Sequence, residues 1–276
     1  MNLTYLGTSA AEGWPGIFCR CEFCERAKRL GGRDIRTRSQ ALLDDALLFD
    51  LGPDTYMHML RDGLDMPGIR HVLITHTHQD HFYPVELLFR SPGFAHEVEN
   101  TLTLYGSDAM VRAVKDSFKA YPDGSVLRRG KTACSEIALY EPTDIAGYLV
   151  SAMLAAHDKN ERCYIYLVEK DGRALLYGND TGIFPDETWD YLKGRRLTLV
   201  SLDCTMGRFK EGSNHMGIPD VIEVKERLVQ MGCADENTRF VATHFSHNGQ
   251  LTHRELTEEL SPHGIETAYD GMRIEV

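Results

Sequence analysis

Features that mark several protein classes are missing from this chain of 276 residues. It contains no apolar run of about 18 residues, the length at which a membrane-spanning helix becomes a candidate. Its first residues, MNLTYLGTSAAEGWPG, lack the basic start and apolar stretch of a secretory signal. From these two absences we expect a cytoplasmic protein with no membrane partner.

Basic residues are fewer than acidic residues. The chain has 30 Lys and Arg residues against 41 Asp and Glu, a formal net charge of -11. Its densest basic stretch, RLGGRDIRTRS at 29–39, is short. Proteins that bind DNA or RNA through the backbone neutralise many phosphates with Lys and Arg. A nucleic-acid partner is therefore disfavoured, whereas a small anionic substrate is compatible with this charge.

A disulfide framework is not indicated, although the chain has seven cysteines. Cys19, Cys21 and Cys24 crowd within six residues, and three thiols cannot pair off among themselves. Such crowding favours metal binding in a reducing compartment. The other cysteines are scattered and are interpreted as buried free thiols: Cys134, Cys163, Cys204 and Cys233.

Short runs rich in β-branched and aromatic residues alternate with stretches of helical length. Asp-Asp at 44–45 and Asp-Gly at 171–172 have the turn chemistry of hairpins. This mixture predicts sheets covered by helices on their outer faces. No linker or repeat divides the chain, so we expect a single domain over 1–276, in which the poorly patterned segment 91–135 is a candidate lid or insertion. Helices are expected at 53–61, 107–120, 185–192, 219–231 and 252–260.

The strongest motif follows a buried-strand run: VLITHTHQDH contains His76, His78, Asp80 and His81. Residues two apart in an extended chain project to the same side, so His76 and His78 can reach one metal ion together. Asp80 and His81 come after the turn and can face a second ion. Three imidazoles and a carboxylate in six residues are costly to crowd together without a cation.

Further candidate ligands come later in the chain, mostly where a strand gives way to a loop. Each would be unremarkable alone, but their shared position relative to strands suggests a common site. The exception is His215, which lies in a loop between a strand and a helix. The candidates are His157, Asp180, His215 and His244.

With His157, Asp180 and His244 following in order, THTHQDH resembles the metallo-β-lactamase superfamily, and the resemblance spans nearly the whole chain. It implies an α+β fold, a four-layer αββα sandwich with a dinuclear metal site between its two sheets. It also implies how the ligands divide: His76, His78 and His157 hold one ion, Asp80, His81 and His244 hold the other, and Asp180 bridges them.

Two positions narrow the branch of the superfamily that the chain resembles. Oxygen-reducing di-iron members usually carry a glutamate where this chain has His78. Antibiotic-cleaving members often carry a cysteine where Asp180 stands. The resemblance therefore implies a dinuclear hydrolase that acts on phosphodiesters, thioesters or lactones.

The second histidine of THFSH, His247, is not needed for the dinuclear site. A zinc-binding loop at about 15–30, with Cys19, Cys21 and Cys24, could close over it and complete a tetrahedral Cys3His site. The alternative is three reduced cysteines and an uninvolved histidine. The zinc arrangement resembles the phosphodiesterases of the carbon–phosphorus lyase pathway, which hydrolyse 5-phosphoribosyl 1,2-cyclic phosphate and carry a structural zinc.

The resemblance implies hydrolysis of a phosphodiester, such as a cyclic ribose phosphate. Two divalent ions, Mn2+ or Zn2+, would make hydroxide available near neutral pH and clamp a phosphate oxygen. His215 would protonate the leaving group, and Asp80 is counted as catalytic as well as a ligand. The chain departs from that group in the stretch between His81 and His157, which is longer here. A lactonase or thioesterase, a tRNA 3′-processing endonuclease and a homodimer remain open alternatives.

Overall fold

Two sheets of seven strands each form the centre of the computed structural model, which describes residues 1–121 and 124–276. The first sheet has the order β14-β1-β2-β3-β4-β5-β6, with bounds Met272–Glu275, Asn2–Gly7, Gln40–Leu43, Leu47–Phe49, His71–Leu73, Leu102–Gly106 and Thr132–Glu136. The second has the order β13-β12-β11-β10-β9-β8-β7, with bounds Ile265–Thr267, Arg239–Thr243, Leu199–Asp203, Arg173–Gly178, Tyr164–Lys170, Tyr148–Leu154 and Thr143–Ile145.

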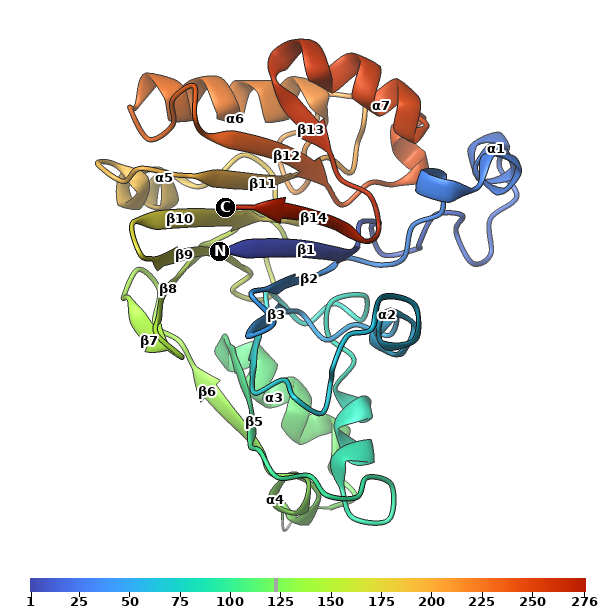
Figure 1. The fold of residues 1–276 in the computed structure, drawn as a ribbon, viewed down its shortest axis with the longest axis vertical. Coiled ribbons are helices and arrows are strands. Elements are labelled where there is room, and N and C mark those ends of the chain that lie inside the picture. Colours follow the sequence, from blue (N-terminus) through green and yellow to red (C-terminus); the bar gives the residue numbers. More distant parts are fainter. Residues whose placement is uncertain (122–123) are drawn as a thin grey trace.

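Helices cover the outer faces of both sheets (Figure 1). On the first sheet α3 contacts β5 and β6, and on the second α7 contacts β13. The α-helices α1 to α7 are Glu22–Leu30, Thr55–Asp62, Asp108–Ser117, Ser125–Arg129, Asp186–Leu192, Ile218–Gln230 and His253–Leu260. Short 3-10 turns η1 to η4 are Gly32–Asp34, Pro84–Arg90, His247–Gly249 and Ser261–His263. In the described ranges no helix is long and apolar enough to cross a bilayer.

Alternation along the strands explains why the first sheet is covered on both faces. In β4, Leu73 points into the core between the sheets, whereas its neighbour Val72 packs in the outer layer with side chains of α3. Strand residues alternate between faces, so one apolar strand serves both layers. Across the inner core, Phe49 of the first sheet stacks on Tyr177 of the second, with ring centroids 4.1 Å apart. The expected αββα sandwich is confirmed.

Both predicted hairpins are present, since β2 pairs with β3 and β9 with β10 in antiparallel register. The five expected helices correspond to α2, α3, α5, α6 and α7, whereas α1 and α4 were not predicted. Segment 91–135 contains β5, α3, α4 and most of β6, so much of it belongs to the first sheet and its cover. Its residues 122–123 lie outside the described residues, and a lid role stays a prediction.

The direction of the strands gathers their carboxyl ends at one edge of the sandwich. β3 and β4 are parallel, as are β10, β11 and β12. β8 runs the same way, because it and β10 are both antiparallel to β9. Ligand sites in sheets with parallel strands lie beyond these carboxyl ends. Polar residues that follow these strands therefore meet in one place.

Candidate metal centres

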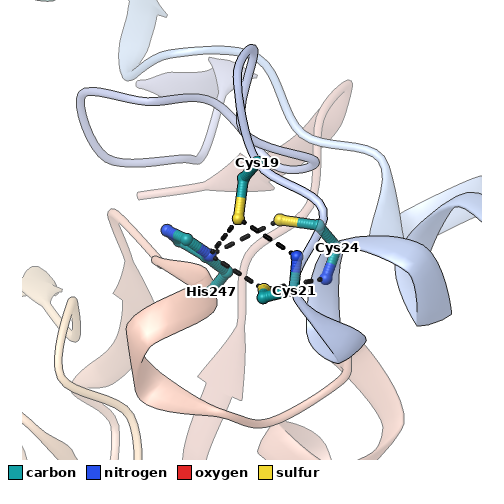
Figure 2. A group of neighbouring side chains, drawn as sticks. All are labelled: Cys19, Cys21, Cys24 and His247. Carbon is teal, nitrogen blue, oxygen red and sulfur yellow. Dashed lines mark hydrogen bonds between the residues drawn. The ribbon is translucent and has the colours of Figure 1, made fainter.

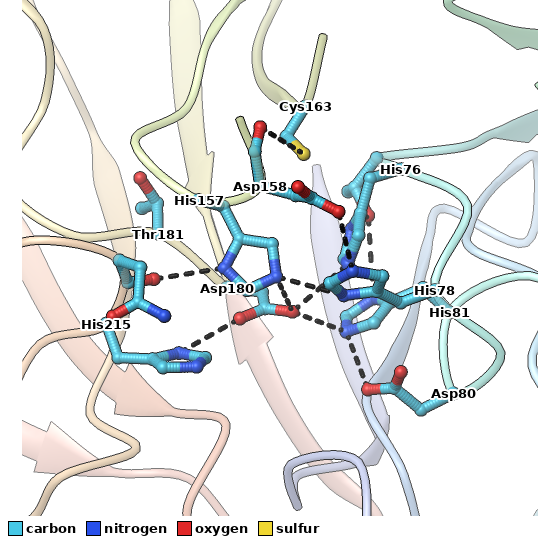
Figure 3. A network of polar contacts seen from close by, with 12 residues as sticks. His76, His78, Asp80, His81, His157, Asp158, Cys163, Asp180, Thr181 and His215 are labelled. Atoms are coloured by element: carbon cyan, nitrogen blue, oxygen red, sulfur yellow. Dashed lines mark hydrogen bonds and ion pairs between the residues drawn. The ribbon is translucent and has the colours of Figure 1, made fainter. Parts of the chain in front are cut away.

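Asp180, two residues after the end of β10, lies at the centre of the cluster (Figure 3). One carboxylate oxygen, Oδ2, is 3.3 Å from Nε2 of His76 and 3.3 Å from Nε2 of His157. The same oxygen is 3.1 Å from Nε2 of His81 and 3.7 Å from Nε2 of His244. Asp180 is 3% exposed. A single buried oxygen thus faces two groups of imidazoles, as a bridging ligand would.

The two groups have the spacing of metal ligands. In the first, Nδ1 of His78 is 3.1 Å from Nε2 of His157. In the second, Nε2 of His81 is 3.2 Å from Nε2 of His244 and 3.2 Å from Oδ2 of Asp80. Ligand nitrogens around a tetrahedral ion lie roughly 3.3 Å apart when each bond is about 2.0–2.1 Å. All seven predicted ligands are brought together in these two groups.

The partners of Nδ1 in His81 and His244 fix which nitrogen of each ring faces the cluster. Nδ1 of His81 is 2.7 Å from Oδ2 of Asp50, and Nδ1 of His244 is 3.1 Å from Oδ2 of Asp203. A carboxylate accepts, so the Nδ1 proton of each imidazole points to its carboxylate and Nε2 is the nitrogen left to bind a metal. The two Nε2 atoms are 3.2 Å apart, a spacing at which both could coordinate one ion.

The first group is oriented in the same way from outside. Nε2 of His78 is 3.2 Å from Oδ2 of Asp158, so its Nδ1 faces inward. Nδ1 of His157 is 3.0 Å from the carbonyl oxygen of Asn214, so its Nε2 faces inward. Nδ1 of His76 is 3.0 Å from the hydroxyl of Thr75. Ligating histidines in proteins usually have their second nitrogen fixed by such a partner.

The electrostatics favour positive charge at this point. Burial alone would lower the pKa of His81, but the carboxylates of Asp80 and Asp50 raise it well above its usual range. Burial would raise the pKa of Asp180, but the surrounding imidazoles, His244 first, hold it well below its usual range. By contrast, burial lowers the pKa of His157 to about 4, which keeps this imidazole neutral and able to ligate. A bound metal would supply the charge that the carboxylates favour.

His215 lies beside the bridging carboxylate, in the loop between β11 and α6. Its Nδ1 is 3.1 Å from Oδ1 of Asp180 and 3.6 Å from Oδ2 of Asp203. Burial would lower its pKa, but these two carboxylates raise the pKa of His215 to about 11. The oxygen that His215 faces is the one not turned toward the other imidazoles.

Asp50 and Asp203, which orient two ligands, were not identified from the sequence. Asp50 directly follows β3, and Asp203 is the last residue of β11. Both side chains are buried, with 0% exposed. The signal that found Asp180, a polar residue at the end of an apolar strand, is also present in LLFDLG and LVSLDC. The same rule would therefore have found them.

A cavity of about 480 Å3 adjoins the first group of ligands. It has one cationic wall residue, Lys159, next to loop residues of both β8–β9 and β11–α6. Its walls are His78, His157, Asp158, Lys159, Asn160, Ser213 and Asn214. Every wall residue has a polar side chain and two of them are candidate ligands, so a small anionic molecule could approach the metal centre from this side.

A second centre lies at the N-terminal loop and η3 (Figure 2). Nδ1 of His247 is 3.4, 3.3 and 3.4 Å from the sulfurs of Cys19, Cys21 and Cys24. A tetrahedral zinc with ordinary bond lengths of about 2.3 Å to sulfur and 2.0–2.1 Å to nitrogen would separate these atoms by roughly 3.6 Å. The structure thus brings together the four predicted ligands of the Cys3His site.

The local fold explains how the three cysteines converge. Cys21 is the N-cap of α1, and its sulfur accepts a hydrogen bond from the backbone N–H of Cys24. Cys24 is thereby placed in the first turn of the helix, with its sulfur toward the same point. The helix was missed because Cys21 is not among the residues that usually signal an N-cap.

Comparisons with known proteins agree with this geometry. A family model for the beta-lactamase superfamily domain matches residues 46–245. The Ribonuclease Z of Microcystis aeruginosa is 28% identical over 221 residues, 79% of this chain and 64% of that protein. The Ribonuclease Z of a Picosynechococcus strain is 34% identical over 228 residues, 80% of this chain and 63% of that protein. The chain therefore spans slightly less than two thirds of these relatives.

Solved structures show the same fold. A diphosphatase from the PhnP family superposes with a TM-score of 0.74 at 24% identity, covering 100% of this chain and 97% of that one. Zn2+-bound PqqB from Methylobacterium extorquens gives 0.74 at 18% identity, with 100% of both chains covered. The short form of human tRNase Z gives 0.68 at 18% identity, covering 100% and 99%.

The family match bears directly on the cluster around Asp180. Residues 46–245 include the whole stretch from His76 to His244, in which all seven candidate ligands of the dinuclear centre lie. The strand-end positions of these ligands, the two stacked sheets and the family match all lead to one assignment. The chain belongs to the metallo-β-lactamase superfamily.

Proposed function

We propose that this protein is a metal-dependent hydrolase that cleaves a small anionic phosphodiester. The observation that carries the proposal is the pair of ligand groups that share Oδ2 of Asp180, with His215 on the other oxygen of that carboxylate. Seven ligands are too many for one tetrahedral ion. Every donor in these groups is nitrogen or oxygen, a set that suits both Mn2+ and Zn2+.

The residues of the cluster have separate roles in the proposed hydrolysis. Two divalent ions in these groups would supply a nucleophile from water near neutral pH and neutralise a phosphate oxygen. Asp180 fixes the two groups relative to each other, and Asp80 completes the second group with His81 and His244. We assign proton donation to the leaving alkoxide to His215, the imidazole at the cluster that is not a predicted ligand.

The cavity beside the first ligand group supports a small substrate. Its cationic residue, Lys159, neighbours the ligand His157, so an anion there would lie near the metal centre. The structure of the PhnP-family diphosphatase supports phosphorus chemistry for this fold. A cyclic ribose phosphate is the substrate that we favour within this class.

Cleavage of RNA is the second candidate. The curated relatives are ribonucleases, and they give no support to the expectation that nucleic acid is not a partner. The net charge of -11 is the observation against it, because RNA-binding surfaces neutralise phosphates with basic residues. A lactonase or thioesterase would use the same centre on a carbonyl group and would depend less on His215.

We further propose that Cys19, Cys21, Cys24 and His247 hold one structural zinc ion. Three soft thiolates and one imidazole are the ligands that zinc prefers in such sites. Four protein ligands leave no position for water, so this centre would be structural. It would tie the N-terminal loop to η3, which starts three residues after His244.

A substrate panel tests the assignment. Purified protein would be assayed with a bis-aryl phosphodiester, a cyclic ribose phosphate, a precursor tRNA, a lactone and a thioester, at matched metal concentration. We expect turnover of the phosphodiesters, fastest for the cyclic ribose phosphate, and its loss in Asp180→Ala. Turnover of the lactone or thioester alone would refute phosphodiester chemistry, and tRNA cleavage far above the others would favour the ribonuclease.

A further inference from the structure

Asp50 orients a candidate metal ligand and has a left-handed backbone conformation. Its Oδ2 is 2.7 Å from Nδ1 of His81, and its Oδ1 accepts a hydrogen bond of 2.8 Å from the backbone N–H of Thr75. Its φ of 66° lies in the left-handed region, which is unfavourable for a residue with a side chain. Such a conformation persists only where the surroundings hold it. The position of the His81 ring therefore depends on what fixes the Asp50 backbone.

The carbonyl of Asp50 is held by a buried side chain from the neighbouring strand. Nε2 of Gln40 donates to the carbonyl oxygen of Asp50 at 2.9 Å and to the hydroxyl of Thr55 at 2.9 Å. The Thr55 hydroxyl in turn donates to the carbonyl oxygen of Gly52 at 2.7 Å. Gln40 thus holds the turn after β3 at two points, directly and through Thr55.

Burying the amide of Gln40 at this position is energetically unfavourable unless it is fully hydrogen-bonded. It lies on the same face of β2 as Leu42, which packs in the apolar outer layer of the first sheet. Gln40 is 1% exposed, and a buried amide is unfavourable unless its donors and acceptor are satisfied. Here both donors are used, so the remaining oxygen needs a donor.

His58 of α2 supplies that donor. Its Nδ1 is 2.6 Å from Oε1 of Gln40, and because that oxygen accepts, the proton of His58 lies on Nδ1. Its Nε2 is 2.7 Å from the hydroxyl of Thr37. Burial lowers the pKa of His58 to about 4, against the opposing effect of Asp270, so the ring is neutral near pH 7.

We propose that Gln40 and His58 are positioning residues for the second ligand group. His58 orients the Gln40 amide, the amide holds the Asp50 carbonyl, and Asp50 directs Nε2 of His81 toward the metal centre. The inference rests on the two-ion site proposed above. It assigns a role in metal binding to two residues that lie outside the ligand cluster and act on it through Asp50.

Titration with Mn2+ tests the inference, because manganese favours nitrogen and oxygen ligands over the thiolates of the second centre. Free Mn2+ would be followed by its EPR signal in protein stripped of metal by mild chelation. Wild-type protein should bind two equivalents. Gln40→Met, which keeps the length of the side chain, should weaken one equivalent by about 10- to 100-fold and leave the other unchanged.

Two further sets of variants separate positioning from general loosening. Val114→Ala makes a gap in the same outer layer without contacting the Gln40 network, and it should leave both equivalents unchanged. His58→Leu should weaken the same equivalent as Gln40→Met. His58→Asn should restore it, because the amide nitrogen of Asn takes the place of Nδ1. This pair decides the matter if Gln40→Met does not fold.

The Mn2+ titrations distinguish the positioning role from the two-ion proposal. Two equivalents of wild-type affinity in Gln40→Met, or equal weakening of both, would overturn the positioning role while leaving the proposed function intact. The same weakening in Val114→Ala would overturn it as well. A single equivalent in the wild-type protein would instead refute the two-ion proposal and, with it, this inference.

Discussion

Replacing Cys21 by serine is the most direct test of the cysteine centre, because the structure lets one role of this residue be removed without the other. Cys21 is a ligand candidate and also the N-cap of α1. Serine is among the preferred N-cap residues, so Cys21→Ser keeps the cap and removes the thiolate. Any large effect then reports on the metal.

The size of the effect follows from the chain length that the zinc ion would close. Cys24 and His247 are 223 residues apart in sequence. A cross-link over such a distance constrains the unfolded chain by about 5 kcal/mol in the loop-entropy model. At roughly 2 °C for each kcal/mol in a chain of this size, complete loss would lower Tm by about 10 °C. We expect a decrease of about 10 °C, because a site left with three ligands should release the ion.

Differential scanning calorimetry together with zinc analysis by mass spectrometry measures both quantities. Cys21→Ser should release about one zinc ion per chain, and Cys134→Ser, a partly buried thiol in β6, serves as the matched control. Turnover should persist at low temperature when Mn2+ is supplied, because the dinuclear ligands are untouched. Unchanged zinc content and unchanged Tm would show that the cluster is three ordinary thiols.

Four other outcomes are expected. Reconstitution should return two divalent ions at the Asp180 cluster, and activity that saturates with one would contradict this. His215→Ala should lower kcat by ~10²-fold or more with metal content unchanged, whereas stoichiometric metal loss would make His215 a ligand. Asp203→Asn should weaken metal binding by about 10- to 100-fold, because the carboxylate holds the proton of His244, and unaltered affinity would remove that role. The pKa of His58 in the folded chain, about 4, lies below its ordinary value, so the folded state binds fewer protons than the unfolded state. The free energy of unfolding measured by urea titration should therefore fall as pH drops from about 6.5 toward 4, by at most about 3 kcal/mol, and His58→Asn should flatten this part of the profile.

The residues that cluster around Asp180 could be predicted from the sequence because they are polar residues at or just after the sharp end of an apolar run. His76 and Asp180 stand out against the buried runs that precede them. Orienting groups such as Asp50 have the same local signal, but their partner is set by strand order, which the sequence pattern does not define. Likewise, the distance between His247 and Cys19 is fixed only when the two sheets stack.

Local chemistry also explains the elements that were missed. Helix α1 begins at a cysteine cap, and a cysteine cluster is normally read as a loop. The 3-10 turn η2 has proline at its start and only three residues per turn, a period that amphipathic patterns do not reveal. By contrast, Thr252 and Glu255 form a capping box, and the helix that they begin, α7, was predicted.

The candidate ligands of the dinuclear centre come from both sheets, since His76 to His81 follow β4 while His157, Asp180 and His244 follow strands of the second sheet. A metal ion bound there would fasten the two halves of the sandwich across their shared edge. Binding to the folded chain alone is thermodynamically linked to unfolding, at about 2.7 kcal/mol for each site when free metal is 100 times its dissociation constant. The melting temperature of this protein should therefore rise with the concentration of manganese. A shortage of metal would destabilise the fold as well as abolish activity at the site.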